Sequence, residues 1–431
     1  MTGDIFFKTV SHFFPKLSIW LQSVDDPRNE NKIIYSPSHL LWLGIFLFLL
    51  RLGSKRKIKF KLATEDFLEN LNKLCPGYSE NVAHHDTVEY FLERLESEEL
   101  YIVRQKMINR LVRMKALDKF RLLDKYLTIA VDGTGHLVFK ERHCPHCLTK
   151  KKDGKVLYYY HNVLEAKIVA ENGLSLSIET EFIQNSDGAT KQDCELAAFY
   201  RLAKRLKKRF PQLNICMLLD GLYMADPVFN MMDKYNWKYI ITFKEGSMPD
   251  TYREYLSLKN LCPENIKEIK NNNIIQNYSW VNHISYRGPV FDVLECNESK
   301  TDSWGEREDT RFLWATNFLI NSSNCKKIAK GGRLRWKIEN EGFNIQKNRG
   351  FNLEHPYSQN EMSMKNLYLL LQIAYIISQL MEKGSLLKDK IQKVFGSVTM
   401  LFEQLLEDLR TKSIGVNFSN KPIQIRLASF P

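Results

Sequence analysis

Two short apolar segments, each followed directly by an Asp-Gly pair, constrain the fold of this chain most. Residues 126–131 precede Asp132, and residues 215–219 precede Asp220. Uninterrupted apolar runs of this length, without polar alternation, predict strands that are buried on both faces. Such strands are typical of an α/β sheet covered by helices. We therefore expect the two aspartates to lie at the carboxyl ends of strands, where an α/β sheet carries its reactive groups.

The surrounding pattern extends these two strands into a longer series. The periodicity predicts further strands over 156–170, 174–183 and 238–243, and helices over 191–210 and 227–235. Glu171-Asn172-Gly173 predicts a hairpin turn, and Gly133-Thr134-Gly135 is expected to break the first strand after Asp132. Three strands followed by alternating helices and strands is the order of a ribonuclease-H-like domain. We expect this domain over residues 119–355 of an α/β protein.

The flanking regions, residues 1–118 and 356–431, predict helices without strands. An apolar run of 11 residues at 40–50 is too short to span a bilayer, so it predicts a buried helix that Ser36-Pro37 opens. His84-His85 precede a second helix and are interpreted as part of its cap rather than as metal ligands.

Residues 250–325 predict an antiparallel β insertion within the α/β domain. Strand-like segments at 278–286, 290–296 and 311–318 follow an Asn-rich stretch at 271–277, which is interpreted as a loop. Helical periodicity returns at about residue 326 and continues to residue 347.

The charge balance favours a polyanionic partner. The formal net charge is +12, which favours nucleic acid over an anionic membrane, although a merely soluble basic protein has the same balance. The densely basic stretch 51–61 is either a DNA contact or a solvated face, and a DNA contact is the preferred interpretation. The eight cysteines are scattered, and no signal peptide precedes the chain, so we expect free thiols in the cytoplasm.

Asp132 and Asp220 have the chemistry of a divalent cation site. Mg²⁺ prefers one or two carboxylates together with water and phosphate oxygens, and two such ions serve displacement at phosphorus. An Asp-Gly pair after a strand is also a common turn. Because both pairs follow apolar runs, a metal site and a pair of turns are open alternatives at this point.

A third element is the helix predicted around residues 333–347. Arg335 and Glu339 are four residues apart and share one face, where they form either a surface ion pair or part of a site. Trp336 and Ile338 are among the apolar residues between the charges, so the helix is expected to pack closely. Basic residues beside a metal-binding carboxylate suit a phosphate backbone.

Taken together, Asp-Gly-Thr-Gly at 132–135, Asp-Gly at 220–221 and Arg-Trp-Lys-Ile-Glu-Asn-Glu at 335–341 resemble the DDE transposases of insertion-sequence group four. The similarity runs from about residue 26 to residue 355. It implies that Asp132, Asp220 and Glu339 are the catalytic residues and hold two Mg²⁺ or Mn²⁺ ions.

The same family carries a Tyr-x₂-Arg-x₃-Glu-x₆-Lys signature. Arg335 and Glu339 match it, whereas Gly332 stands at the Tyr position and Gln346 at the Lys position, followed by Lys347. The resemblance thus implies that Arg335 and Lys347 contact DNA phosphates.

By resemblance, the protein is a bacterial transposase that acts on double-stranded DNA as a homodimer in the nucleoid. It would cut phosphodiesters at the ends of its element and join the 3′-hydroxyl to target DNA. The helices of residues 1–118 would recognise the element ends. Two alternatives are a ribonuclease-H-like nuclease without strand transfer and a non-catalytic DNA-binding derivative.

Glu339 and Glu341 compete for the role of third carboxylate. Two residues apart on a helix, they point roughly 200° apart, so only one can face the aspartates. Glu339 shares its face with Arg335 and with Gly342, which leaves room for DNA or a strand to approach. Glu341 is expected to pair with Lys337 on the other side.

Cys144 and Cys147 have the spacing of zinc ligands. A structural zinc site usually has four ligands, and the chain has no second Cys-x-x-Cys. His136 or His161 could complete a site. Unliganded thiols in a loop are the preferred interpretation.

Overall fold

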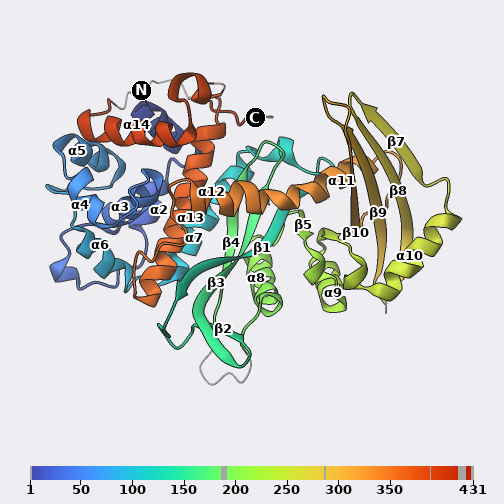
Figure 1. Cartoon of the computed structure of the whole chain (residues 1–431). Coiled ribbons are helices and arrows are strands. Elements are labelled where there is room, and N and C mark those ends of the chain that lie inside the picture. Colours follow the sequence, from blue (N-terminus) through green and yellow to red (C-terminus); the bar gives the residue numbers. More distant parts are fainter. Residues whose placement is uncertain (1, 186–191, 286–287, 389, 416–423, 429–431) are drawn as a thin grey trace.

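The protein is a mixed α/β structure in which one large sheet joins a helical body to a β-rich arm (Figure 1). The computed structural model describes residues 2–185, 192–285, 288–388, 390–415 and 424–428. The predicted α/β class is confirmed.

The sheet has ten strands in the order β2-β3-β1-β5-β6-β10-β9-β8-β7, and β4 also pairs with β3. Its central strands β1, β5 and β6 are parallel, and the other pairs are antiparallel. The strands are β1 (Leu127–Phe139), β2 (Leu148–Lys152), β3 (Lys155–Val169), β4 (Ser175–Ile183), β5 (Ile215–Leu219), β6 (Lys238–Thr242), β7 (Ile266–Asn271), β8 (Ile274–Ser285), β9 (Val290–Thr301) and β10 (Arg307–Thr316).

The predicted break of the first strand is wrong. β1 continues through Gly133-Thr134-Gly135 and is irregular only between Gly135 and Leu137. Asp132 therefore lies within the strand, opposite Glu165 of β3, and not at its end. The glycines are tolerated because β3 hydrogen-bonds this part of β1 along its length.

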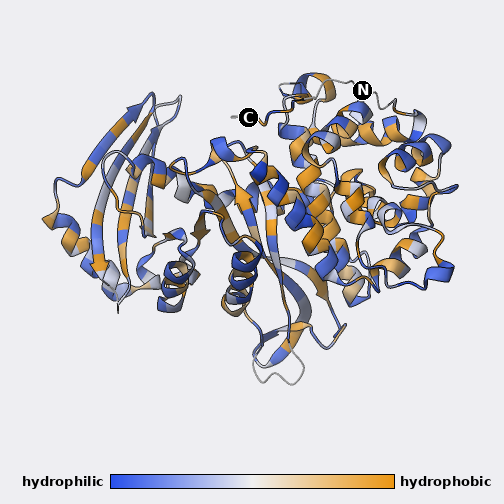
Figure 2. Ribbon diagram, turned by 180° about the vertical axis from the view of Figure 1, so that it is seen from behind, coloured by the Kyte–Doolittle hydropathy of each residue, from blue (hydrophilic) through white to orange (hydrophobic). Residues whose placement is uncertain are grey.

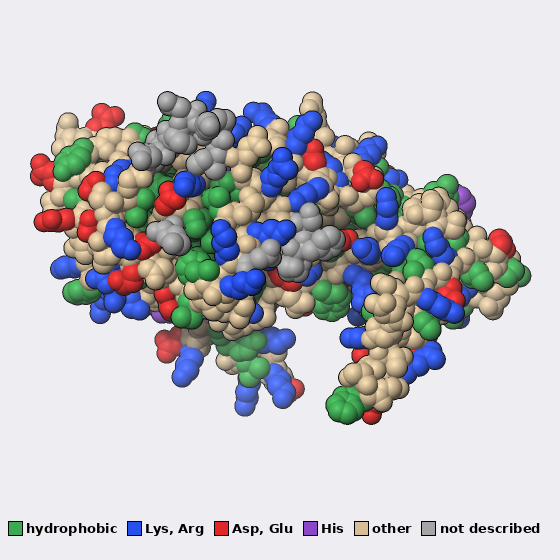
Figure 3. Space-filling view, turned by 90° about the horizontal axis from the view of Figure 1, so that it is seen from above, with side chains coloured by type: hydrophobic (Ala, Val, Ile, Leu, Met, Phe, Trp, Pro, Cys, Tyr) green, Lys and Arg blue, Asp and Glu red, His purple; other side chains and the backbone are tan. Residues whose placement is uncertain are grey.

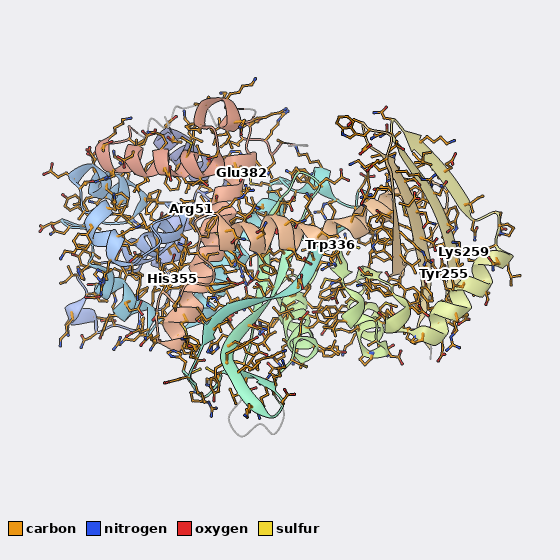
Figure 4. The ribbon with its side chains drawn as sticks, viewed as in Figure 1. Arg51, Tyr255, Lys259, Trp336, His355 and Glu382 are labelled. Atoms are coloured by element: carbon orange, nitrogen blue, oxygen red, sulfur yellow. The ribbon has the colours of Figure 1, made fainter. Side chains whose placement is uncertain are left out.

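The β insertion is antiparallel, as predicted, and it extends the central sheet where β10 pairs with β6. The Asn-rich stretch interpreted as a loop instead forms the β7–β8 hairpin, whose turn places Asn272 at a φ of 49°. The helix α10 (Pro249–Leu261) was not predicted and covers β8. From α10, Tyr255 and Lys259 bind the buried carboxylate of Glu295 at 2.7 and 2.8 Å (Figure 4).

The helices predicted at the two ends of the chain pack together into one helical body. α13 packs against α3 and α7, and α14 packs against α1 and α5. Figure 2 shows hydrophobic residues gathered at the centre of this body. The N-terminal helices are α1 (Thr2–Phe13), α2 (Leu17–Gln22), α3 (Pro37–Leu49), α4 (Arg56–Leu62), α5 (Glu65–Leu74), α6 (His85–Leu92) and α7 (Ser97–Arg113), and the C-terminal ones are α13 (Glu361–Lys383) and α14 (Val398–Thr411).

The predicted buried helix is α3, and every one of its residues is buried. Ser36 caps it by accepting a hydrogen bond from the His39 N–H, with Pro37 in the first turn. His84 caps α6 by accepting from the Asp86 N–H, as the sequence predicted for a capping role. Among the described residues, no helix is long and apolar enough to cross a bilayer.

The basic residues of the stretch 51–61 differ in exposure, because Arg51 is half-buried whereas most of the later ones are exposed. The Arg51 guanidinium lies 3.3 Å from the Phe351 ring centre and 4.8 Å from that of Phe402, and burial lowers its pKa to about 9. Figure 4 shows it beside α13, which carries Glu382. Arg51 is half-buried and packs against two aromatic rings, which argues against its interpretation as a DNA contact. Arg56, Lys57, Lys59 and Lys61 are exposed.

Candidate active site

Of the two aspartates predicted as metal ligands, Asp132 lies on β1 and Asp220 directly follows the neighbouring parallel strand β5. β1 and β5 pair with Ala130 beside Leu218. Continued by two residues, this register brings Asp220 level with Asp132, and neighbouring strands are about 4.8 Å apart. Asp220 follows β5 directly and accepts a hydrogen bond from the Leu222 N–H at 2.9 Å. Asp220 thus forms the local turn that is common for an Asp-Gly pair after a strand.

The predicted third element is a continuous helical segment that crosses the central strands. It comprises α11 (Cys325–Arg333), the 3₁₀ turn η5 (Leu334–Trp336), the π-helical turn η6 (Ile338–Phe343) and α12 (Asn344–Asn348). Both η5 and η6 contact β1. Widened π-helical turns recur at functional sites because they redirect side chains. Here the widened turn carries Glu339.

Arg335 joins this helical segment to β1. Its guanidinium lies 3.0 Å from a carboxylate oxygen of Glu339 and 3.5 Å from one of Asp132. The Arg335 side chain is only 8% exposed, so this is not the surface ion pair considered from the sequence. The structure therefore brings Asp132, Arg335 and Glu339 together.

The carboxylates of Asp132 and Glu339 repel each other when both are charged. Burial, and then the facing carboxylate of Glu339, raise the pKa of Asp132 to about 7, against the opposing effect of Arg335. The positive charge of Arg335 thus offsets the repulsion between the two carboxylates only in part. A partly buried cluster of carboxylates with an elevated pKa is typical of a functional site that gains a cation.

Glu195 is a fourth carboxylate of this cluster and was missed in the sequence. It begins α8 (Glu195–Arg209) and accepts a hydrogen bond from the Tyr223 hydroxyl at 2.8 Å. Burial raises its pKa, and the negative charge of Asp220 adds to the effect; Glu195 in turn contributes to the raised pKa of Asp132. Nothing in the periodicity of residues 191–210 distinguishes a helix-opening glutamate of a site from an ordinary first-turn acid.

Glu341 points away from the aspartates. Its carboxylate pairs with Lys337, as predicted, and its backbone carbonyl accepts a hydrogen bond from the Tyr375 hydroxyl of α13. A Cβ on the neighbouring Gly342 would lie 3.0 Å from the Ser175 hydroxyl and 3.3 Å from the Lys167 side chain. The absence of a side chain at Gly342 therefore lets β3 and β4 pack close to the helix. A close strand was one of the two neighbours expected for this glycine, DNA being the other.

The two departures from the Tyr-Arg-Glu-Lys signature have structural reasons. A Cβ at Gly332 would lie 2.5 Å from the indole nitrogen of Trp314, so this β10 side chain occupies the space of a larger residue. Gln346 is fully buried and hydrogen-bonds Gln372 at 2.9 Å. Lys347 pairs with Glu354 at 2.7 Å, and no contact joins it to the carboxylates in the described part of the chain.

A cavity of about 420 Å³ adjoins the helical segment, and neither Arg335 nor any of the four carboxylates lines it. It lies between the loop after β6, the strand β10 and the helical segment, and Figure 4 shows Trp336 at this junction. Its wall contains aromatic and charged side chains, which are Phe243, Tyr252, Phe312, Trp314, Trp336, Lys244, Glu245, Arg311 and Arg333. Arg311 pairs with Glu295 and Arg333 pairs with Glu298.

Preformed metal geometry differs between the two candidate sites. Asp132, Asp220 and Glu339 do not form a group whose ligand atoms all lie within 4.8 Å of one another, whereas Cys144, Cys147 and His161 do, as judged over the described residues. The carboxylates of Asp132, Asp220 and Glu339 are hard oxygen donors, a type of ligand that suits Mg²⁺ or Mn²⁺.

Neither a protein-family model nor a curated protein matches this chain.

Proposed function

We propose that this protein is a DDE transposase that cuts phosphodiesters at the ends of an insertion sequence and joins the 3′-hydroxyl to target DNA. The observation that carries the proposal is the meeting of Asp132 and Glu339 around Arg335, with Asp220 directly after the neighbouring strand β5. The antiparallel set β1, β3 and β4, continued by α8, β5, α9 (Asp226–Tyr235) and β6, supports a ribonuclease-H-like domain.

Asp132, Asp220 and Glu339 would hold two Mg²⁺ or Mn²⁺ ions, with Glu195 close by. When bound, such ions activate a water or a 3′-hydroxyl and stabilise the leaving oxygen. Arg335 has five N–H donors and engages two carboxylates. With cations on the carboxylates, its guanidinium would be released to bind a DNA phosphate and orient it. Lys347 would contact a more distant phosphate.

The charge distribution supports DNA as the partner. Figure 3 shows Lys and Arg side chains spread over the face seen from above, and the net charge is +12. Double-stranded DNA carries a dense row of phosphates that such a face attracts. We propose a homodimer on DNA, because joining two element ends requires both to be held, and a location in the bacterial nucleoid.

The proposal is tested by comparing two neighbouring glutamates. Glu339→Gln is expected to reduce metal-dependent cleavage by about 100-fold or more, because it removes a metal-binding charge. Glu341→Gln is expected to keep most of the activity, because that carboxylate pairs with Lys337. The assay uses DNA carrying the inverted repeats that flank the gene, with Mg²⁺ or Mn²⁺, and circular dichroism and DNA binding as controls. Full cleavage by folded Glu339→Gln protein would reject the site.

Strand transfer separates this function from its rivals. A pre-cut element end with a free 3′-hydroxyl is incubated with plasmid DNA, and joined products are sought. A transposase joins the end to the plasmid, whereas a nuclease of the same fold only cuts. Failure of both cleavage and joining, with DNA binding intact, would identify a non-catalytic DNA-binding derivative.

A further inference from the structure

A second group of potential metal ligands lies outside the acidic cluster. Cys144 and Cys147 come from the loop between β1 and β2, and His161 comes from β3. The two sulfurs are 3.6 Å apart, and each lies 3.4 Å from Nε2 of His161. Cys147 and His161 are buried, and Cys144 is half-buried.

These three distances are those of one face of a tetrahedron around a metal ion. Zinc binds cysteine sulfur at about 2.3 Å and histidine nitrogen at about 2.0 Å, which at tetrahedral angles separates two sulfurs by about 3.8 Å and a sulfur from a nitrogen by about 3.5 Å. A disulfide would need its sulfurs about 2.05 Å apart and gives no reason for an imidazole nitrogen to face both.

The surroundings hold this geometry in place. His143 and His146, which lie between the cysteines or beside them, are turned to backbone carbonyls of Gln359 and Asn185, each at 2.7 Å. The Asn185 side chain also donates to the Cys147 carbonyl at 2.9 Å. The two loop histidines are therefore engaged elsewhere, and His161 alone completes the group.

We propose that Cys144, Cys147 and His161 bind one Zn²⁺ ion. Two sulfurs and one imidazole form a donor set that selects zinc over Mg²⁺ or Mn²⁺. Binding would release the protons of the two thiols, and water would take the fourth position. This replaces the interpretation of the cysteines as unliganded.

The zinc site would fasten two parts of the molecule. It joins the loop before β2 to β3, and the same loop reaches Gln359 and Glu361 at the start of α13 through His143 and His146. The ion would thus stabilise the junction between the sheet and the helical body. This role is independent of the acidic cluster and of its chemistry.

The test is the metal content of the full-length protein. Protein from cells grown with zinc, purified without chelators, is expected to carry about one zinc per chain by mass spectrometry of the elements. Cys144→Ser, Cys147→Ser and His161→Gln should each lower zinc content several-fold, whereas Cys262→Ser, a half-buried cysteine after α10, should leave it unchanged. Cobalt replacing zinc should give thiolate-to-cobalt absorption in the wild type and in Cys262→Ser.

A second measurement covers variants that fail to fold. Chelation of wild-type protein should lower its thermal midpoint, and Zn²⁺ but not Mg²⁺ should restore it. A wild type that carries no zinc and shows no cobalt absorption, or a Cys144–Cys147 disulfide in the purified protein, would overturn the proposal. Zinc retained by folded Cys147→Ser protein would overturn it as well.

Discussion

The imidazoles of His39 and His136 are buried among aromatic side chains, against Tyr35 and Tyr368. Burial lowers the pKa of both groups to about 4, from about 6.5 in an exposed chain. Between these values the unfolded chain binds a proton that the folded protein does not. Their contribution to stability is therefore complete above about pH 6.5 and is lost as pH falls towards 4.

We expect the free energy of unfolding to fall by about 1 kcal/mol per buried histidine between about pH 7.5 and about pH 5.5. His39→Gln should remove roughly half of the part due to this pair. The measurement is urea unfolding at the two pH values. His355→Gln is the control, because that side chain is exposed. An equal pH dependence in wild type and His39→Gln would show that burial of this imidazole is not the cause.

At the scale of elements, the contact between α11 and β10 depends on the absence of a side chain. A Cβ at Gly332 would lie 2.5 Å from the Trp314 indole nitrogen, and Trp314 is itself buried. Gly332→Ala is expected to destabilise the protein by about 1–3 kcal/mol, because overpacking outweighs the better helix propensity of alanine. Gly246→Ala should change stability little, because no atom lies within 4 Å of its added Cβ.

Chemical denaturation measures the free energy of unfolding of both variants. A third variant tests whether the Trp314 indole causes the loss of stability in Gly332→Ala. Trp314→Phe, which is smaller at the point of contact, should cost less in the Gly332→Ala background than in the wild type. Additive losses in the double variant would mean that the indole does not create the strain.

The elements that could be predicted from the sequence are those whose burial follows directly from their own apolar residues. α3 is apolar throughout, and β5 is buried at every position, so both were predicted from sequence. β2 was missed because most of its Leu-Thr-Lys-Lys-Lys sequence is not buried, and its pairing with β3 alone makes it a strand. The Gly133-Thr134-Gly135 stretch was misjudged for a related reason, since pairing with β3 overrides local propensity.

The candidate site was predictable in part for the same reason. The spacing of Arg335 and Glu339 on a helix, and the apolar runs before Asp132 and Asp220, are local patterns. Glu195 owes its place beside Asp132 to the packing of α8 on the sheet, which no local pattern encodes. His161 reaches the cysteines through the pairing of β1 with β3 and was one of two histidines considered.

For the whole molecule, helices from both ends of the chain pack into one body, so the folding of the two ends is linked. The backbone N–H of Thr2 donates to Asp408 of α14 at 2.8 Å, and the Thr2 hydroxyl does so at 2.7 Å. The exposed lysines of α4 lie on this body, apart from the β insertion at the other end of the sheet (Figure 1). A DNA end bound at α4 would thus be held by a unit that includes both termini.

The proposed binding to DNA is expected to depend on salt, because the net charge of the protein is +12. Each phosphate that a lysine or arginine neutralises releases counterions and contributes about −0.9 to the slope of log affinity against log salt. We expect a steep slope for the wild type, measured by fluorescence anisotropy on a short duplex, and a flat response would reject the electrostatic account.

Lys57→Ser with Lys59→Ser should reduce the slope by about 1–2, because both side chains are exposed on α4. Lys270→Ser is the matched control, since its ammonium pairs with Glu268 at 3.0 Å in the insertion. An unchanged slope in the double variant, beside a reduced slope in Lys270→Ser, would move the DNA contact from α4 to the β insertion.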